Sequence, residues 1–412
     1  MEKQLFDKYA DLITNYATTR YMDMFREPAG GLQHKFIVPG SASYNNCLWD
    51  WDSWLTNIAL RQIAPHEAIF EYEKGCIRNF FDFTDPDGRI PICIVPASKP
   101  RTTPPMEEGN IHKPCLAQHT LFIVEQSGDA EWMRDGFPKI ERFINFYRTR
   151  CFHKETGLFV WINDGAIGVD NDPCTFFRPR YSSASIYLNC FMYKELEATA
   201  KLAERLGYTE KVAAYLEEAE TLKKAIQDQC WDERDGFYYS VDTSVLPVNP
   251  DDKRHKGCPR HWGGLIQRIG VWSGFLAMWA GIATPEQAER MVKEHYLNEK
   301  TFNAPFGVRT LSKMEKMYLV VKSGNPSCWL GPIWGISNYM TFDGLRRYGY
   351  DAEARELAEK TITMFGQDIE EHGEMSEYYH PELGLPMNNP GFQNWNLLSL
   401  DMITWMREKF MK

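Results

Sequence analysis

The chain has 412 residues, with 43% hydrophobic and 25% charged side chains, as is typical of a globular protein. Its net charge is −10 at pH 7 and it has no basic stripe, which argues against nucleic acid or an anionic membrane as a partner. Aromatic residues reach 14% and include 13 tryptophans, which suits a large core and also a carbohydrate site.

Ten cysteines are scattered along the chain without a CxxC or CxxxC pair, so the sequence predicts no zinc site of thiolates, and we expect no metal or cofactor. The charged N-terminal segment 1–8 does not resemble a signal peptide, and no apolar run is long enough to span a membrane. Reduced thiols and a cytoplasmic location are therefore expected.

Apolar residues recur at helical spacing through most of the chain. Some segments, such as 209–228, are apolar on one side, whereas others, such as 269–280, are apolar on most faces and should be buried. The pattern predicts about twelve helices, at residues 2–20, 51–63, 65–83, 114–127, 138–150, 182–207, 209–229, 269–281, 285–297, 331–348, 351–369 and 390–409.

Alternation of half-exposed and buried helices in pairs favours an all-α fold, an (α/α)6 toroid that forms one domain over residues 1–412. The clearest strand signal is a hairpin around 231–241. Long loops rich in glycine and proline should crowd one face of the ring, and loops of this length are usually functional. They cover residues 24–49, 85–113, 161–181, 242–262, 299–329 and 372–394.

Carboxylates beside aromatic residues occur at 49–54, 165–173 and 374–384. Aromatic rings can cover the C–H face of a sugar, and hydrolysis of a glycosidic bond needs two carboxyl groups that face it. Each segment taken alone could equally be a helix cap or a turn, because Asp and Asn are common there.

Six segments in order resemble known motifs. They are WDS at 51–53, KPCLAQ at 113–118, GVDN at 168–171, CWDERDGFYY at 230–239, GPIW at 331–334 with Asn338 and Tyr339, and the segment 377–384. Together they make the chain, from about Trp49 to Asp401, similar to the trehalase-like (α/α)6 glycosidases. The likeness is greatest to glycoside hydrolase family 63 and its small bacterial members, some of which hydrolyse mannosylglycerate or glucosylglycerate. The resemblance implies inversion at α-linked sugars.

The resemblance makes Asp170 the general acid and Glu377 the general base. A general acid must keep its proton near neutral pH, so burial or a nearby negative charge has to favour the protonated carboxyl. Asp172 stands where the family usually has serine and remains an alternative acid; Glu374 remains an alternative base. An inverting pair should lie roughly 6.5–9.5 Å apart to leave room for water.

The resemblance and the loop positions also suggest substrate contacts. Asp52 would accept two hydroxyls of the non-reducing sugar, and two arginines near the acid could hold the carboxylate of an acidic aglycone. The predicted contacts are Trp51, Asp52, Gln118, Asn171, Arg178, Arg180, Trp334, Tyr379 and Gln393. Helix capping, core packing or pairing with structural carboxylates are the alternatives for Asp52, Trp334 and the arginines respectively.

The sequence thus predicts an inverting glycoside hydrolase that releases α-linked glucosyl or mannosyl units from a disaccharide or glycosyl-glycerate. A small carbohydrate is the only partner it indicates. A sugar 2-epimerase with a similar ring would need histidine acid–base pairs, and a disaccharide phosphorylase would need inorganic phosphate. A sugar-binding protein without catalysis is a further alternative, against which both carboxylates argue.

Overall fold

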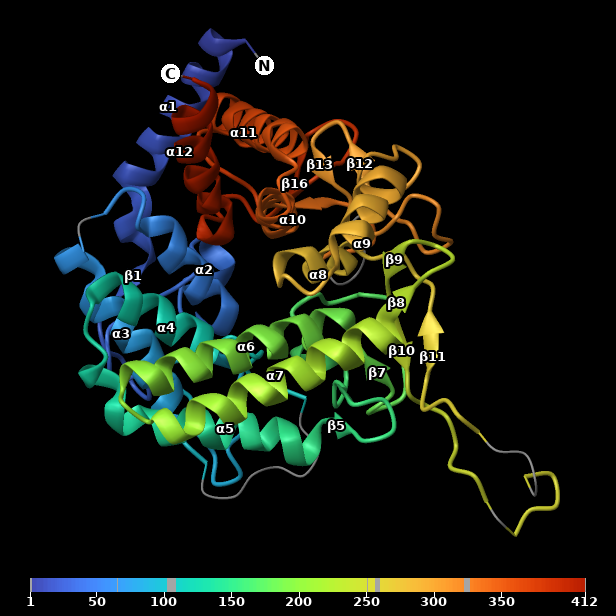
Figure 1. Cartoon of the computed structure of the whole chain (residues 1–412). Helices are drawn as coiled ribbons and strands as arrows, with labels where there is room; N and C mark the ends of the chain where they lie inside the picture. Colours follow the sequence, from blue (N-terminus) through green and yellow to red (C-terminus); the bar gives the residue numbers. More distant parts are fainter. Residues whose placement is uncertain are drawn as a thin grey trace.

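The computed structural model describes residues 2–64, 66–101, 109–249, 251–255, 260–321 and 327–411. Within these residues the fold is mainly helical, and each of the twelve predicted segments contains an α-helix (Figure 1). The helices are α1 (Lys3–Arg20), α2 (Asp50–Leu60), α3 (His66–Asp82), α4 (Leu116–Ser127), α5 (Phe137–Arg150), α6 (Ile186–Arg205), α7 (Thr209–Cys230), α8 (Leu276–Trp279), α9 (Pro285–Arg290), α10 (Gly335–Arg347), α11 (Asp351–His372) and α12 (Ser399–Phe410).

Several helices differ in extent from the prediction. The predicted helix 269–281 is reduced to a 3-10 turn, η5 (Trp272–Phe275), followed by the single turn α8. The predicted helix 390–409 starts with the 3-10 helix η7 (Asn394–Leu398). The predicted helices 182–207 and 331–348 begin late, because short strands occupy their first residues. Apolar periodicity marks a buried segment well but does not distinguish a 3-10 turn or a short strand from an α-helix.

Short antiparallel strands connect the loops. The described residues contain sixteen strands of two or three residues: β1 (Phe25–Arg26), β2 (Phe36–Ile37), β3 (Leu48–Trp49), β4 (Cys93–Ile94), β5 (Phe152–His153), β6 (Leu158–Phe159), β7 (Ser183–Ala184), β8 (Trp231–Asp232), β9 (Phe237–Tyr238), β10 (Ser240–Asp242), β11 (Leu265–Gln267), β12 (Asn303–Ala304), β13 (Gly307–Val308), β14 (Ile333–Trp334), β15 (Tyr378–Tyr379) and β16 (Pro386–Asn388). The predicted hairpin is confirmed as β8 paired with β9. Most of the other strands are too short to leave a periodic signal.

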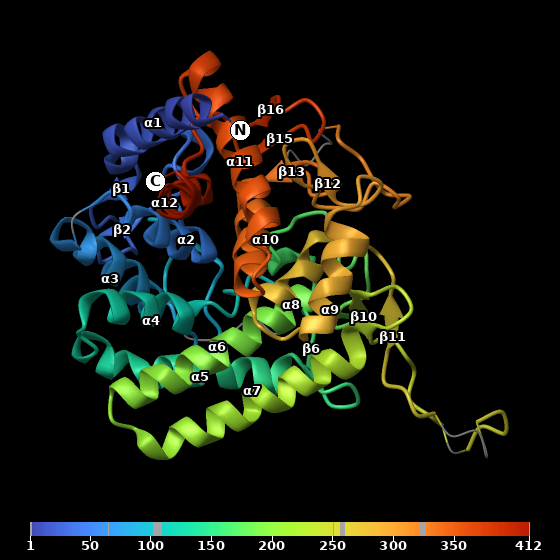
Figure 2. The same cartoon turned by 45° about the horizontal axis from the view of Figure 1, so that its top comes forward.

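The even-numbered helices contact one another in a circuit. α2 contacts α4, α4 contacts α6, α6 contacts α8, α8 contacts α10, α10 contacts α12, and α12 returns to α2 (Figure 2). Their side chains are largely buried: ten of the eleven residues of α2 are. The one-sided helices lie outside this circuit, with α3 against α2 and α4, α7 against α6, and α11 against α10.

The two ends of the chain meet. α1 packs against α11 and α12, and Lys3 Nζ donates to the carbonyl oxygen of Met411 at 3.1 Å (Figure 1). The N-terminal helix therefore covers the outside of the last two helices. In the described part of the chain, no helix is both long and apolar enough to cross a membrane.

Candidate active site

A pocket lies where the long loops meet, with an empty volume of about 440 Å³ that includes the open solvent at its mouth. Five of the six predicted long loops contribute to it; the described part of the sixth, 242–262, projects from the body between β10 and β11 (Figures 1 and 2). The lining residues are Tyr44, Trp49, Trp51, Asp52, Ile92, Lys113, Gly168, Asp170, Ser327, Trp329, Trp334, Glu377, Phe392 and Trp395. Loops far apart in sequence therefore build one site.

Tryptophans form much of the wall. The rings of Trp329 and Trp334 stack with centroids 3.9 Å apart and planes inclined by 11°. Trp51 approaches Trp395 edge-on at 5.4 Å, and Trp334 Nε1 donates to the carbonyl oxygen of Cys328 at 2.8 Å. These contacts fix large apolar faces against the pocket, as a site for a pyranose ring requires.

Glu377 lies just before β15 and is only 3% exposed. Tyr44 Oη donates to its Oε1 at 3.0 Å, and Asn388 Nδ2 donates to its Oε2 at 2.9 Å. Burial raises the pKa of Glu377, and the charge of Asp170 raises it further, while the hydrogen bonds lower it. The effect of Asp170 means that the two carboxyl groups lie within electrostatic reach.

The loop that carries Asp170 is held from both sides. Gly168 has φ +66°, and a Cβ there would lie 2.6 Å from Lys113 Cε and 3.3 Å from Trp51 Cζ2, so a side chain would strain the backbone and displace the Lys113 side chain. Asn171 Oδ1 accepts a hydrogen bond from the Trp329 backbone N–H at 2.7 Å. Asp170, between these anchors, is half-buried and lines the pocket.

The two alternative carboxylates do not line the pocket. Asp172 is buried, and its Oδ1 accepts from the Cys174 backbone N–H at 2.8 Å, as a turn cap does. Burial raises the pKa of Asp172 to about 6. Glu374 is half-buried, with its Oε2 near Gly391 rather than in the pocket. The geometry thus favours Asp170 and Glu377 over their alternatives.

Asp52, in the first turn of α2, lines the pocket and is 7% exposed. Burial raises its pKa to about 7, whereas the charge of Lys113 and a hydrogen bond from Asn394 lower it. Asn394 Nδ2 donates to Asp52 Oδ1, and its own Oδ1 accepts from Thr56 Oγ1 at 3.1 Å. Asn394 keeps this position with φ +28°, a backbone conformation that L-residues rarely adopt.

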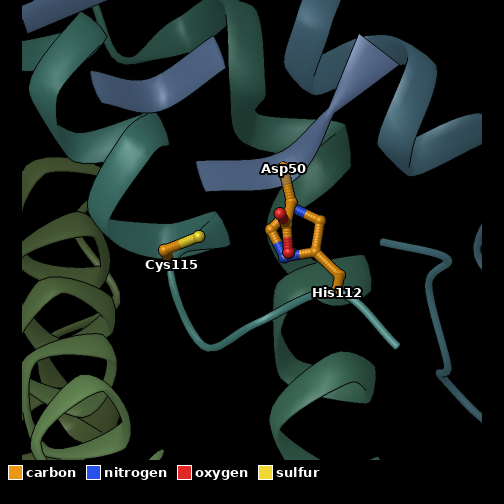
Figure 3. Close-up of side chains that lie close together, drawn as sticks. All are labelled: Asp50, His112 and Cys115. Carbon is orange, nitrogen blue, oxygen red and sulfur yellow. The ribbon is translucent and has the colours of Figure 1, made fainter. Parts of the chain in front are cut away.

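Behind the pocket, Asp50, His112 and Cys115 lie close together, with the Cys115 thiol directed toward the other two (Figure 3). Asp50 Oδ1 accepts from Lys113 Nζ at 2.7 Å, and Asp50 Oδ2 accepts from the Lys113 backbone N–H at 2.7 Å. His112 Nδ1, which lies 3.9 Å from Asp50 Oδ2, donates to the Lys113 carbonyl oxygen at 2.6 Å, so this nitrogen offers no lone pair toward Asp50. Because both Asp50 oxygens already accept from Lys113, the cluster fits a hydrogen-bonded ion pair better than a metal site.

Six of the nine predicted contact residues lie outside the pocket lining, and Gln118, Tyr379 and Gln393 are among them. Gln118 Nε2 donates to the carbonyl oxygens of Pro114 and Phe191 at 2.7 and 3.2 Å. Tyr379 Oη donates to Asp368 Oδ2 at 2.7 Å. The Gln393 side chain is buried, and its Oε1 has no hydrogen-bond partner among the described residues.

Neither predicted arginine lines the pocket. Arg178 is half-buried and pairs with Asp242 at the end of β10. Arg180 is exposed and also has an interaction partner. Of the predicted residues, the structure brings Trp51, Asp52, Asp170, Trp334 and Glu377 together at the pocket, and Asn171 directly behind it.

Sequence reasoning missed several pocket residues. Tyr44 and Trp329 belong to predicted long loops, but no charge pattern or motif singles them out. Trp49 opens the aromatic and acidic segment 49–54, which drew attention to Trp51 and Asp52 instead. Lys113 opens the KPCLAQ segment, which drew attention to Gln118 instead. Lys113 can be recognised as a pocket residue only once its segment is known to contact the loop that carries Gly168 and Asp170.

A sequence model of the mannosylglycerate hydrolase MGH1-like glycoside hydrolase domain matches residues 44–395, a range that begins and ends on pocket residues. The chain belongs to this family. It is therefore a glycoside hydrolase, and the resemblance to glycoside hydrolase family 63 is confirmed.

Individual mannosylglycerate hydrolases are similar to the chain in sequence and in structure. Mannosylglycerate hydrolase MGH1 of Selaginella moellendorffii is 28% identical over 411 aligned positions, covering 86% of this chain and 79% of the relative. The GH63 mannosylglycerate hydrolase of Thermus thermophilus in complex with glucose matches with a TM-score of 0.69 at 20% identity, over 98% of this chain and 100% of that one. The same enzyme with Tris and D-glycerate gives a TM-score of 0.66 at 19% identity, over 98% and 100%.

A more distant glycosidase shares the fold. Neutral trehalase Nth1 from Saccharomyces cerevisiae matches with a TM-score of 0.62 at 18% identity, over 90% of this chain and 74% of the trehalase. The chain thus shares its fold with a trehalase as well as with members of its own family.

Proposed function

We propose that this glycoside hydrolase cleaves an α-linked glucosyl or mannosyl unit from a small substrate with inversion of the anomeric centre. Asp170 protonates the leaving oxygen, and Glu377 removes a proton from the water that attacks the opposite face. The observation that carries the proposal is that these two carboxylates, from distant loops, line one tryptophan-walled pocket, where the charge of Asp170 raises the pKa of Glu377.

Asp52 accepts hydroxyls of the non-reducing sugar beside Trp51, and Trp334 covers a face of the ring. Asn171 acts from behind by holding the acid loop on Trp329. We propose that Gln118, Tyr379 and Gln393 stabilise the segments around the pocket and do not contact the substrate, because their side chains do not line the pocket.

The architecture that suits this site is an (α/α)6 toroid in one domain. The closed circuit of contacts among the even-numbered helices supports it, and so does a hydrophobic cluster that extends from Phe6 to Met406. In such a ring, loops from successive helix pairs converge at one end, which agrees with the origin of the pocket residues.

Two alternative reactions are less well supported. In the described part of the chain, no histidine lines the pocket, although a 2-epimerase needs histidine acid–base groups there. Lys113 is the only lysine or arginine among the lining residues, and its ammonium is fully buried against Asp50, so a phosphate would find no free cation among them.

The substrate is a disaccharide or a glycosyl-glycerate, and the names of the curated relatives favour mannosylglycerate. The test is a hydrolysis screen followed by proton NMR. The substrates are mannosylglycerate, glucosylglycerate, the neutral glycerol analogues of these two, and trehalose. The first spectra should show the β-anomer of the released hexose, as inversion requires. Release of the α-anomer would contradict the roles of both carboxylates.

A further inference from the structure

The Glu377 carboxylate receives hydrogen bonds from two segments that no sequence motif connects. Tyr44 belongs to the loop before β3, 333 residues away, and its hydroxyl lies 3.0 Å from Oε1. Asn388 is the last residue of β16, and its amide nitrogen lies 2.9 Å from Oε2. Each carboxylate oxygen thus accepts a hydrogen bond from a different segment.

Neither donor is free to turn away. The Tyr44 ring contacts Trp49 and Phe392 edge-on, with centroids 6.2 and 5.9 Å apart. Asn388 is also held through its backbone, because its carbonyl oxygen accepts from the Glu377 N–H at 2.9 Å. A bulge shifts the pairing of β15 with β16 next to this point.

Both donors favour the ionised form of the carboxyl group. Hydrogen bonds from Tyr44, Asn388 and the neighbouring Asn389 lower the pKa of Glu377 against the effects of burial and Asp170. Burial and the charges of Glu377, Asp52 and Asp170 raise the pKa of Tyr44, so its hydroxyl keeps the proton that it donates. Lys113, the remaining charged group of the lining, is paired with Asp50.

We infer that Tyr44 and Asn388 are positioning residues for the base: they fix the rotamer of Glu377 and hold its carboxylate ready to accept a proton from water. The inference rests on the proposed role of Glu377. It also makes the active base depend on the loop before β3, since Tyr44 reaches the carboxylate from that loop with its ring against Phe392. A carboxylate that is already oriented avoids the cost of ordering it during the reaction.

The first test is Tyr44→Phe, which removes one hydroxyl and keeps the ring. The free energy of a hydrogen bond to a charged group corresponds to a rate ratio of about 10- to 100-fold. We therefore expect kcat to fall by that factor. The acid limb of the kcat/KM profile should move to higher pH, because a bond that lowers the pKa of Glu377 is lost. Asp52, whose pKa burial raises to about 7, is a second group in the profile. The charges of Lys113 and Asp50 and the hydrogen bond from Asn394 act on it, and all three stay in place in Tyr44→Phe.

Tyr193→Phe is the matched control. The Tyr193 hydroxyl donates to Glu197 Oε1 at the same distance of 3.0 Å, on α6 and away from the pocket. This variant should retain the wild-type kcat and the wild-type pH profile.

The second test is Asn388→Asp, which keeps the shape of a half-buried side chain but replaces a donor by a like charge. It should move the acid limb further than Tyr44→Phe does, whereas Asn388→Ala should give an intermediate shift. Circular dichroism and the Tm of each variant report folding separately.

A direct titration separates this inference from the proposed function. The carbon-13 signal of the Glu377 carboxyl, assigned by its loss in Glu377→Gln, should titrate at higher pH in Tyr44→Phe and Asn388→Asp. If both variants lose only Tm, while the titration and the acid limb stay in place, the two residues are merely structural and the inference is wrong. If Glu377→Gln remains fully active, the proposed function fails, whatever the titration shows.

Discussion

Lys113 Nζ lies 2.7 Å from Asp50 Oδ1 behind the pocket, and neither side chain has exposed surface. The same ammonium lies 4.7 Å from the centre of the Trp51 ring and is close enough to lower the pKa of Asp52. This buried pair thus connects the N-terminal end of α2, which carries Asp52, with the segment before α4.

Removing one partner of this pair should be costly. Lys113→Met leaves the Asp50 charge buried and unpaired, which should lower the free energy of unfolding by about 3–5 kcal/mol. The double variant Asp50→Asn/Lys113→Met removes both charges and should recover most of that loss. Urea unfolding of the three proteins measures the difference. Equal loss in the single and double variants would mean that packing, rather than charge, is what Lys113 contributes.

Asp170→Asn and Glu377→Gln should each reduce kcat by at least about 100-fold, as loss of a general acid or base does, while their Tm values stay near that of the wild type. Asp172→Asn should remain active, because an asparagine oxygen can still accept from the Cys174 N–H. Steady-state rates on the best substrate of the screen decide between the two loops. An inactive Asp172→Asn beside an active Asp170→Asn would reverse the assignment of the acid.

Asn394→Ala should weaken substrate binding in a pH-dependent way. Its hydrogen bond lowers the pKa of Asp52, which burial places at about 7, so its removal raises that pKa further. A larger fraction of Asp52 is then protonated at pH 7 and cannot accept two hydroxyls. We expect KM to rise about 10-fold at pH 7 and to recover toward pH 8.5. A KM ratio that is constant across this range would assign Asn394 a purely structural role.

An acidic aglycone can be tested at Arg178 and Arg180. If either arginine holds the glycerate carboxylate, its change to alanine should raise KM for the glycosyl-glycerate by about 10- to 100-fold and leave a neutral glycoside unaffected. Asp242→Asn is the control at Arg178, because it removes the carboxylate partner but keeps the arginine. If Arg178→Ala and Asp242→Asn change only stability, Arg178 belongs to the scaffold of β10.

Sequence periodicity was sufficient for the helices because each buries a stripe or a whole surface, as in 209–228 and 335–347, and burial leaves a pattern in the chain. It failed where burial does not imply an α-helix: Ile333–Trp334 is apolar but forms a strand, and Trp272–Phe275 forms a 3-10 turn. The motifs around Asp52, Asp170 and Glu377 were recognisable because they are local.

By itself, the sequence determined the helical class, the family and the two loops from which the proposed acid and base come. Only the tertiary structure decided which neighbouring side chains reach the pocket. Lys113 rather than Gln118 lines it, and Tyr44 bonds to Glu377 across 333 residues. The physical reason is that a periodic pattern records the burial of one segment, whereas a hydrogen bond between distant loops depends on how the ring closes and leaves no trace in either segment alone.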